Sequence, residues 1–220
     1  MEDLLDLYAE SYDPARPRVL MDEVPVQRVS ETRVPQPVAP GQPARIDYDD
    51  QREGPCNRLV LAQPEVGFRH VTVTDQRTAQ DFAHQLEALV DDWYPDAEVI
   101  RLVTDNLKIH TPASLYATLG PAEARRIAAK LEWRYTPKHA SWLTQAEIEI
   151  GILRRPCLKR RIPTRVALPQ ETAAWEAPRN AAKATIEWRF TSDKARSKLS
   201  RLYPRNHAGR LLARDGRLML

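Results

Sequence analysis

Glycine, cysteine and long apolar runs are all scarce in this 220-residue sequence. Its seven glycines stand against eighteen prolines, which cluster at residues 34–46 and predict an irregular linker there. The two cysteines, Cys56 and Cys157, form no CxxC-type pair, so nothing indicates a disulfide-stapled scaffold. No stretch reaches the ~18 consecutive apolar residues of a membrane span. The first thirteen residues carry five acids and no base, the reverse of a secretory leader. A reduced, cytoplasmic protein with no membrane partner is expected.

The composition is that of a globular protein, but the charge is unevenly spread. Hydrophobic residues make up 42% of the chain and charged residues 29%, which suits one sizeable domain. Residues 151–165 hold six bases and no acid, and residues 194–220 hold eight bases and one acid. This uneven distribution of charge favours binding of a polyanion by the C-terminal half of the chain. Charge alone is equally compatible with a solvated basic face.

Hydrophobic periodicity predicts strands that alternate with helices. The predicted strands are 18–26, 57–63, 67–74, 99–103 and 131–137, and the second and third form a hairpin. The segment "IEWRFT" at 186–191 copies the alternation of "LEWRYT" and is interpreted as a similar strand or strand-like segment. Helical spacing predicts helices at 78–94, 121–131 and 144–155, others near 169–184 and 192–203, and a short one at the N-terminus. The pattern favours a three-layer α/β domain with a mixed sheet.

Two aspartates, Asp22 and Asp105, are placed near the ends of apolar strands. If these strands are neighbours, the two carboxylates lie side by side, which is costly unless a cation stands between them. Hard oxygen ligands favour Mg²⁺ or Mn²⁺. The helix at 144–155 offers a third acid, either Glu147 or Glu149. Taken singly, each aspartate is as well explained as a loop cap.

Glu147 has a competing interpretation. The stretch Thr144–Glu147 reads T-Q-A-E, a capping box in which the glutamate serves only the helix start. His110 and His139 have no HxxxH or Cys/His spacing that would support zinc, so a polar loop role is favoured. The spacing by itself indicates only a metal nuclease as one candidate.

A longer set of segments, read in order, resembles a known family. Among them are "VLMDEVPVQRVSETR", "VIRLVTDNLKIHTPASLY", "PAEARRIAAKLEWRYTPKHASWL" and "AAWEAPRNAA". Together they are similar to bacterial insertion-sequence transposases of the mariner-related branch of the DDE endonuclease superfamily. The resemblance runs collinearly from about residue 1 to about residue 204.

This resemblance implies an RNase H-like fold and a set of catalytic residues. The family's first acid is followed by glutamate, as Asp22 is, and its second is the aspartate of a D-N pair with a histidine downstream, as in Asp105, Asn106 and His110. The third acid opens a helix in an L-N-x-x-E pattern, which matches Glu147, with Thr144 in place of the asparagine. These three acids are then the catalytic and metal-binding residues, and Asn106, His110 and Thr144 support them.

The implied chemistry is cleavage and joining of DNA strands at the ends of the element, with two Mg²⁺ or Mn²⁺ ions. The implied partners are the terminal inverted repeats and target DNA, with a homodimer assembled on the DNA and a location at the bacterial nucleoid. Basic residues that follow the predicted strand at 131–137 are expected to contact phosphates. They are Lys138, His139, Arg154, Arg155, Lys159, Arg160 and Arg161.

Two departures from the family suggest a truncated copy. Only a short acidic segment precedes the first acid, where the family carries a helix-turn-helix region. The last sixteen residues resemble nothing in the family. The expected organisation is an acidic segment at 1–17, a catalytic domain at 18–204 and a disordered basic tail at 205–220. A non-catalytic remnant that binds DNA or a full-length transposase is the alternative. A free-standing RNase H-like nuclease is a weaker one.

Overall fold

The structure, a computed structural model, describes residues 1–220 except 34–36, 44–48, 139, 158–160, 163 and 204–220. The side chains of residues 141 and 155–157 are also not described. The chain divides into two compact units, one of residues 12–187 and one that joins residues 1–11 to residues from 188 onward. No helix among the described residues is long and apolar enough to span a membrane. The predicted domain boundaries stay a prediction.

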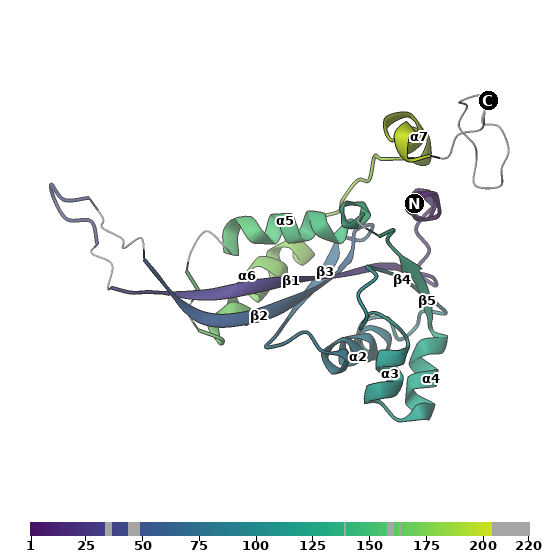
Figure 1. Ribbon diagram of the computed structural model, residues 1–220, viewed down its shortest axis with the longest axis horizontal. Coiled ribbons are helices and arrows are strands. Elements are labelled where there is room, and N and C mark those ends of the chain that lie inside the picture. The colour runs from purple at the N-terminus through teal and green to yellow at the C-terminus, as the bar shows by residue number, and fades with distance from the viewer. Residues whose placement is uncertain (34–36, 44–48, 139, 158–160, 163, 204–220) are drawn as a thin grey trace. The chain divides into compact units, whose positions relative to one another are not determined.

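The larger unit is built on a five-stranded mixed sheet in the order β3-β2-β1-β4-β5 (Figure 1). The antiparallel part consists of three strands: β1 (Arg18–Glu31), β2 (Asp50–Gln63) and β3 (Phe68–Thr74). Two further strands run parallel to β1: β4 (Ile100–Thr104) and β5 (Leu131–Tyr135). All five strands predicted between residues 18 and 137 are confirmed. Strands β1 and β2 are longer than predicted, because each continues into a polar ribbon beyond its buried half.

Helices cover both faces of the sheet, which confirms the three-layer prediction. One face packs against α2 (Ala79–Ala88), the π-helical turn after it (Leu89–Trp93), α3 (Ala113–Thr118) and α4 (Pro121–Ala129). The other face packs against α5 (Ala146–Cys157) and α6 (Ala167–Ala181). Because strand side chains alternate between faces, Val19 and Met21 enter the first core, whereas Val24 and Val26 enter the second.

The exposed edge of β3 is covered by side chains of α6. Asn180 accepts a hydrogen bond from the Arg69 N–H at 3.0 Å and donates one to the Arg69 carbonyl at 2.8 Å. One turn earlier, Glu176 accepts from the Val71 N–H at 2.9 Å. These contacts occupy the backbone groups that a further strand would use, so the helix ends the sheet at this side.

The prediction of a strand at 186–191 is wrong. These residues form no strand, although the Ile186 N–H donates to the Pro64 carbonyl in the connection between β2 and β3. Their alternation copies that of β5, but a strand needs a neighbour with unpaired backbone groups. Since α6 already occupies the edge of β3, the pattern has no partner there.

The smaller unit pairs an acidic helix with a basic one. Helix α1 (Glu2–Ala9) and helix α7 (Ser192–Lys198) are joined by Arg196, which donates to both oxygens of Glu2, at 2.7 and 3.1 Å. A short 3₁₀ turn follows at Ser200–Leu202. The predicted disordered tail at 205–220 lies outside the described residues.

Candidate functional site

Asp22 and Asp105 lie on adjacent, parallel strands. The register pairs Leu20 of β1 with Val103 of β4, so two residues further on Asp22 comes opposite Asp105, which directly follows β4. Asp22 lies on the same side of β1 as Val24 and therefore faces α5 and α6, and Asp105 lies at the end of the neighbouring strand. The sequence placed Asp22 near the far end of a strand, but it lies inside β1, which continues to Glu31.

Burial of Asp22 makes its negative charge costly. The side chain is 7% exposed, and its Oδ1 accepts a hydrogen bond from the Glu23 N–H at 2.8 Å. Its Oδ2 has no hydrogen-bond partner. Burial, helped by the negative charges of Glu147 and Asp105, raises the pKa of Asp22 to about 7. Both of the other acids predicted from the sequence thus act electrostatically on Asp22.

Helix α5 carries the third predicted acid. Glu147 stands in its first turn, half-buried, and the helix packs against β1 and β2. The other acid of this turn, Glu149, is fully buried in ion pairs with Arg69 and Arg179. Glu147 is therefore the acid of α5 that acts on Asp22.

The capping box considered for Thr144 and Glu147 does not form. Helix α5 begins at Ala146, whose N–H donates to the Thr144 hydroxyl at 3.3 Å. Among the described residues, no hydrogen bond joins the Glu147 carboxylate to the Thr144 N–H. Thr144 thus supports the helix start by itself, and the Glu147 carboxylate is not used there. A capping box does form at α2, between Thr78 and Asp81.

His110 is buried between two carboxylates. Its Nδ1 lies 2.5 Å from Asp105 Oδ1, and its Nε2 lies 3.3 Å from Glu23 Oε1. The ring stacks on Phe82, with 4.4 Å between ring centroids. Burial acts to lower its pKa, but the hydrogen bonds to the two carboxylates outweigh burial and raise the pKa of His110 to about 9. The same contact with His110 lowers the pKa of Asp105. The imidazolium is therefore a fixed positive charge behind the site.

The remaining supporting residues hold the strand ends in place. The Leu107 N–H donates to Asp105 Oδ1 at 3.1 Å. Asn106 donates from its side-chain amide to the Thr136 carbonyl, which ties the loop after β4 to the end of β5. Sequence reasoning missed Arg77, whose Nε lies 3.3 Å from Glu23 Oε2. No sequence signal pairs them, because their contact depends on how α2 packs against β1.

The predicted phosphate-binding residues are only partly described. Lys138 and Arg154 are exposed, as a phosphate contact requires. Arg161 forms ion pairs with Glu31 and Asp50, which close the far end of the β1–β2 ribbon. His139, Lys159 and Arg160 lie outside the described residues, and so does the side chain of Arg155. Their contact with DNA stays a prediction.

The fit of the three acids to a divalent cation can be judged from the chain itself. In the part of the chain that the structure describes, no three His, Cys, Asp or Glu side chains form a group that could hold a metal ion as they stand. Asp22 Oδ2 is nevertheless buried without a partner, and two further carboxylates act on it. A cation beside Asp22 would relieve both penalties. Carboxylate oxygens are also the ligands that Mg²⁺ and Mn²⁺ prefer, so the residues fit the ion.

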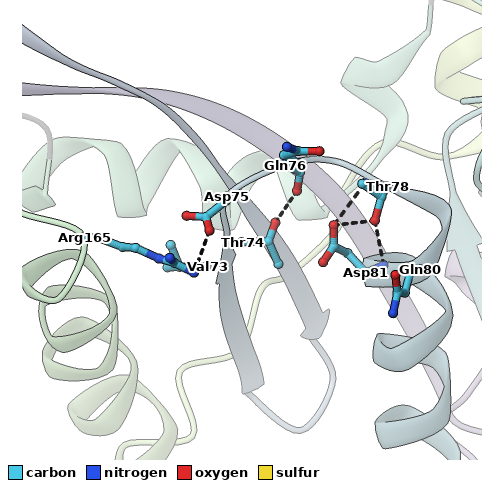
Figure 2. A pocket seen from close by; sticks show the side chains of 8 residues that line it. All are labelled: Val73, Thr74, Asp75, Gln76, Thr78, Gln80, Asp81 and Arg165. Atoms are coloured by element: carbon cyan, nitrogen blue, oxygen red, sulfur yellow. Dashed lines mark hydrogen bonds and ion pairs between the residues drawn. The ribbon is translucent and has the colours of Figure 1, made fainter.

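A polar cavity of about 390 Å³ opens at the end of β3. Figure 2 shows the side chains that line it, which come from the end of β3, the connection between β3 and α2, the first turn of α2, and Arg165. Arg165 pairs with Asp75 at 2.6 Å. Both sequence neighbours of Arg77, Gln76 and Thr78, line this cavity.

Comparison with known proteins gives a family match and a structural match. Residues 17–169 match the family model described as DDE superfamily endonuclease, and all three acids lie in that range. No curated protein matches this sequence.

Among solved structures, the chain is similar to the Mos1 mariner paired end complex with Mn. The TM-score is 0.51 at 20% identity, over 83% of this chain and 54% of that one. It is also similar to the Mos1 strand transfer complex, with a TM-score of 0.49 at 18% identity, over 83% and 55%. The chain thus spans about half the length of these proteins. At this identity the first likeness concerns the fold, and it confirms the predicted RNase H-like architecture.

Proposed function

Because the chain belongs to the DDE superfamily endonucleases, we propose that it is the catalytic region of a transposase that cleaves and joins DNA strands at the ends of an insertion sequence. The observation that carries the proposal is the placement of two acids on adjacent parallel strands with the third on the helix that covers them. Asp22 and Asp105 meet through strand register, and Glu147 acts on Asp22 from the covering helix. The Mos1 structures, which are named as paired end and strand transfer complexes, support the choice of DNA as the partner.

The proposed cofactor is a pair of Mg²⁺ or Mn²⁺ ions held by Asp22, Asp105 and Glu147. When bound, such ions activate the attacking oxygen and stabilise the leaving oxygen of a phosphoryl transfer. The names of two Mos1 structures include Mn and Mg, which supports this choice of metal.

The protein's own task is to present carboxylate oxygens in fixed positions. The Glu23 N–H holds Asp22 by Oδ1, which leaves Oδ2 buried without a hydrogen-bond partner and available to a ligand. The bonds from His110 and Leu107 both end on Oδ1 of Asp105, so its Oδ2 is left for a ligand. This arrangement orients the ligand oxygens through their neighbours, as metal sites commonly do.

The DNA contacts complete the proposal. Terminal inverted repeats and target DNA are the proposed substrates, and a homodimer is expected when both element ends are held together. Lys138 and Arg154 would contribute phosphate contacts that weaken as salt rises, because such contacts depend on the release of counterions.

The decisive experiment is cleavage of DNA that carries matched element ends. The purified chain with Mn²⁺ or Mg²⁺ should nick these ends, and Asp105→Asn should abolish nicking. The variant should keep the fold, because Asn retains the side chain's shape and the Oδ1 acceptor for the Leu107 N–H. Circular dichroism and thermal melting provide the control.

If the wild type never nicks matched ends in either metal while it still binds them, the non-catalytic remnant is the correct interpretation. Cleavage of RNA–DNA hybrids in place of element ends would instead identify a free-standing nuclease.

A further inference from the structure

A buried charge cluster lies beneath the helix that carries Glu147. The cluster consists of Arg69 on β3, Glu149 on α5 and Arg179 on α6, and it is called the α5 anchor below. The side chains of Arg69 and Glu149 are both 0% exposed. Arg69 Nη2 lies 2.9 Å and Arg179 Nη2 lies 3.2 Å from the same oxygen, Glu149 Oε1. One carboxylate therefore joins the helix to two other elements.

Arg69 is itself held rigidly. Its guanidinium donates to the Gly67 carbonyl at 2.8 Å and to the Ala184 carbonyl. Its backbone N–H and C=O are both bonded by the side chain of Asn180. Because both its backbone and its guanidinium are restrained, Arg69 has one defined position in the sheet. The ion pair with Arg69 therefore restrains the position of Glu149 as well.

Stability alone is a weak reason for such a cluster. Removing two charges from water is costly, and a buried ion pair often adds no more stability than well-packed apolar side chains would. Helix α5 already has an apolar contact with the sheet through Ile150 and Leu153, which are almost fully buried. Apolar packing is non-directional, so it leaves the rotation and height of the helix less tightly defined than an ion pair does.

The geometry of α5 links the cluster to the site. At 3.6 residues per turn, residues two apart point about 200° from each other around the helix axis. Glu149 points toward Arg69, and Glu147 therefore leaves the opposite side of the same turn. If the ion pair of Glu149 were lost, a rotation of the helix about its axis would move Glu147 relative to Asp22.

We propose that Arg69 and Glu149 are positioning residues for Glu147. Their ion pair fixes the rotation and height of α5, so that the Glu147 carboxylate comes to the face where Asp22 and Asp105 lie. The inference rests on the proposed function only in assigning Glu147 to the metal site. Arg179, which is 24% exposed and stacks over Trp175 at 5.4 Å, supports the pair from the solvent side.

The test replaces the ion pair by apolar side chains of similar size, in the double variant Arg69→Met/Glu149→Leu. Such an exchange leaves no buried charge without a partner, because Arg179 can reach water. A milder second variant, Glu149→Gln, keeps the shape of the side chain. The matched control is Leu153→Ala, which loosens the apolar contact of the same helix without touching the anchor.

Two measurements are made on each variant together with its melting temperature. The first is the dissociation constant for Mn²⁺, from titration calorimetry. The second is amide hydrogen exchange at Gly151, whose helical N–H bonds back to the Glu147 carbonyl. We expect the double variant to bind Mn²⁺ at least tenfold more weakly, the usual cost of losing groups that orient ligands. Exchange at Gly151 should be faster, with little change in melting temperature.

The control should show the opposite pattern. Leu153→Ala should melt at a lower temperature and keep its Mn²⁺ affinity within about twofold, since the anchor is intact. The proposal is overturned if either anchor variant is folded and keeps both wild-type Mn²⁺ affinity and wild-type exchange at Gly151. A wild type that binds no Mn²⁺ would contradict the proposed function instead, and the exchange measurement would still decide whether the anchor positions the helix.

Discussion

At the scale of single residues, Asp22 is a carboxylate in a place that disfavours its charge. Burial and two neighbouring acids raise its pKa to about 7, roughly 3 pKa units above the ordinary value, which corresponds to at most about 4 kcal/mol at high pH. Asp22→Asn removes this charge. We expect the variant to be more stable than the wild type at pH 8 and to lose Mn²⁺ binding, a trade of function for stability.

Urea denaturation at pH 8 and titration with Mn²⁺ measure the two effects of Asp22→Asn. The exposed Asp92 gives a matched control, since Asp92→Asn should change neither quantity. A variant less stable than the wild type at pH 8 would show that the Asp22 charge is already balanced in the fold.

The sequence predicted the acids of the site better than it predicted their surroundings. Asp22, Asp105 and Glu147 could be found because apolar strands and helix starts are local patterns, reinforced by the family resemblance. The contacts of Glu23 with His110 and Arg77 depend on residues 87 and 54 positions away. No local pattern encodes such distances, so these partners became visible only with the fold.

At the scale of secondary-structure elements, α6 stabilises the sheet by covering the edge of β3. Asn180→Ala removes both bonds to the Arg69 backbone and leaves a backbone N–H and C=O poorly satisfied. We expect a loss of about 2 kcal/mol, or a melting temperature lower by roughly 4–8 °C in a chain of this size.

Gln170→Ala is the matched control for Asn180→Ala, because Gln170 is an exposed amide on the same helix. Thermal melting of the two variants side by side provides the measurement. Equal melting temperatures would mean that the edge of β3 is satisfied without Asn180.

Local patterns placed the elements well where the burial pattern was strong. Phe82, Leu86 and Leu89 have the spacing of one helical face within the predicted helix at 78–94, and all three are buried in α2 and its π-helical turn. The pattern failed at 186–191, where alternation was present but α6 already covers the edge of β3. It also underestimated β1 and β2, because a two-stranded ribbon in solvent carries no apolar alternation to mark its extent.

At the scale of the whole molecule, Asp22 and His110 give stability the same dependence on pH. The pKa of His110 in the fold, about 9, lies above its ordinary value of 6.5. Its contribution is therefore fully present below pH 6.5 and is lost as the pH rises through 9. The pKa of Asp22, about 7 against 3.8, is also raised, so stability falls as the pH rises from about 4 to 7. The lowered pKa of Asp105 acts oppositely, at acid pH only.

The melting temperature should therefore be higher at pH 6 than at pH 9, and two variants should separate the causes. Asp22→Asn should flatten the part of the profile between pH 4 and 7, and His110→Gln the part between pH 6.5 and 9, because each removes one titrating group. Melting curves across pH 4–9 in metal-free buffer measure this. If both variants keep the wild-type dependence of melting temperature on pH, other groups govern the profile. In that case the pKa values of Asp22 and His110 are not raised by the fold.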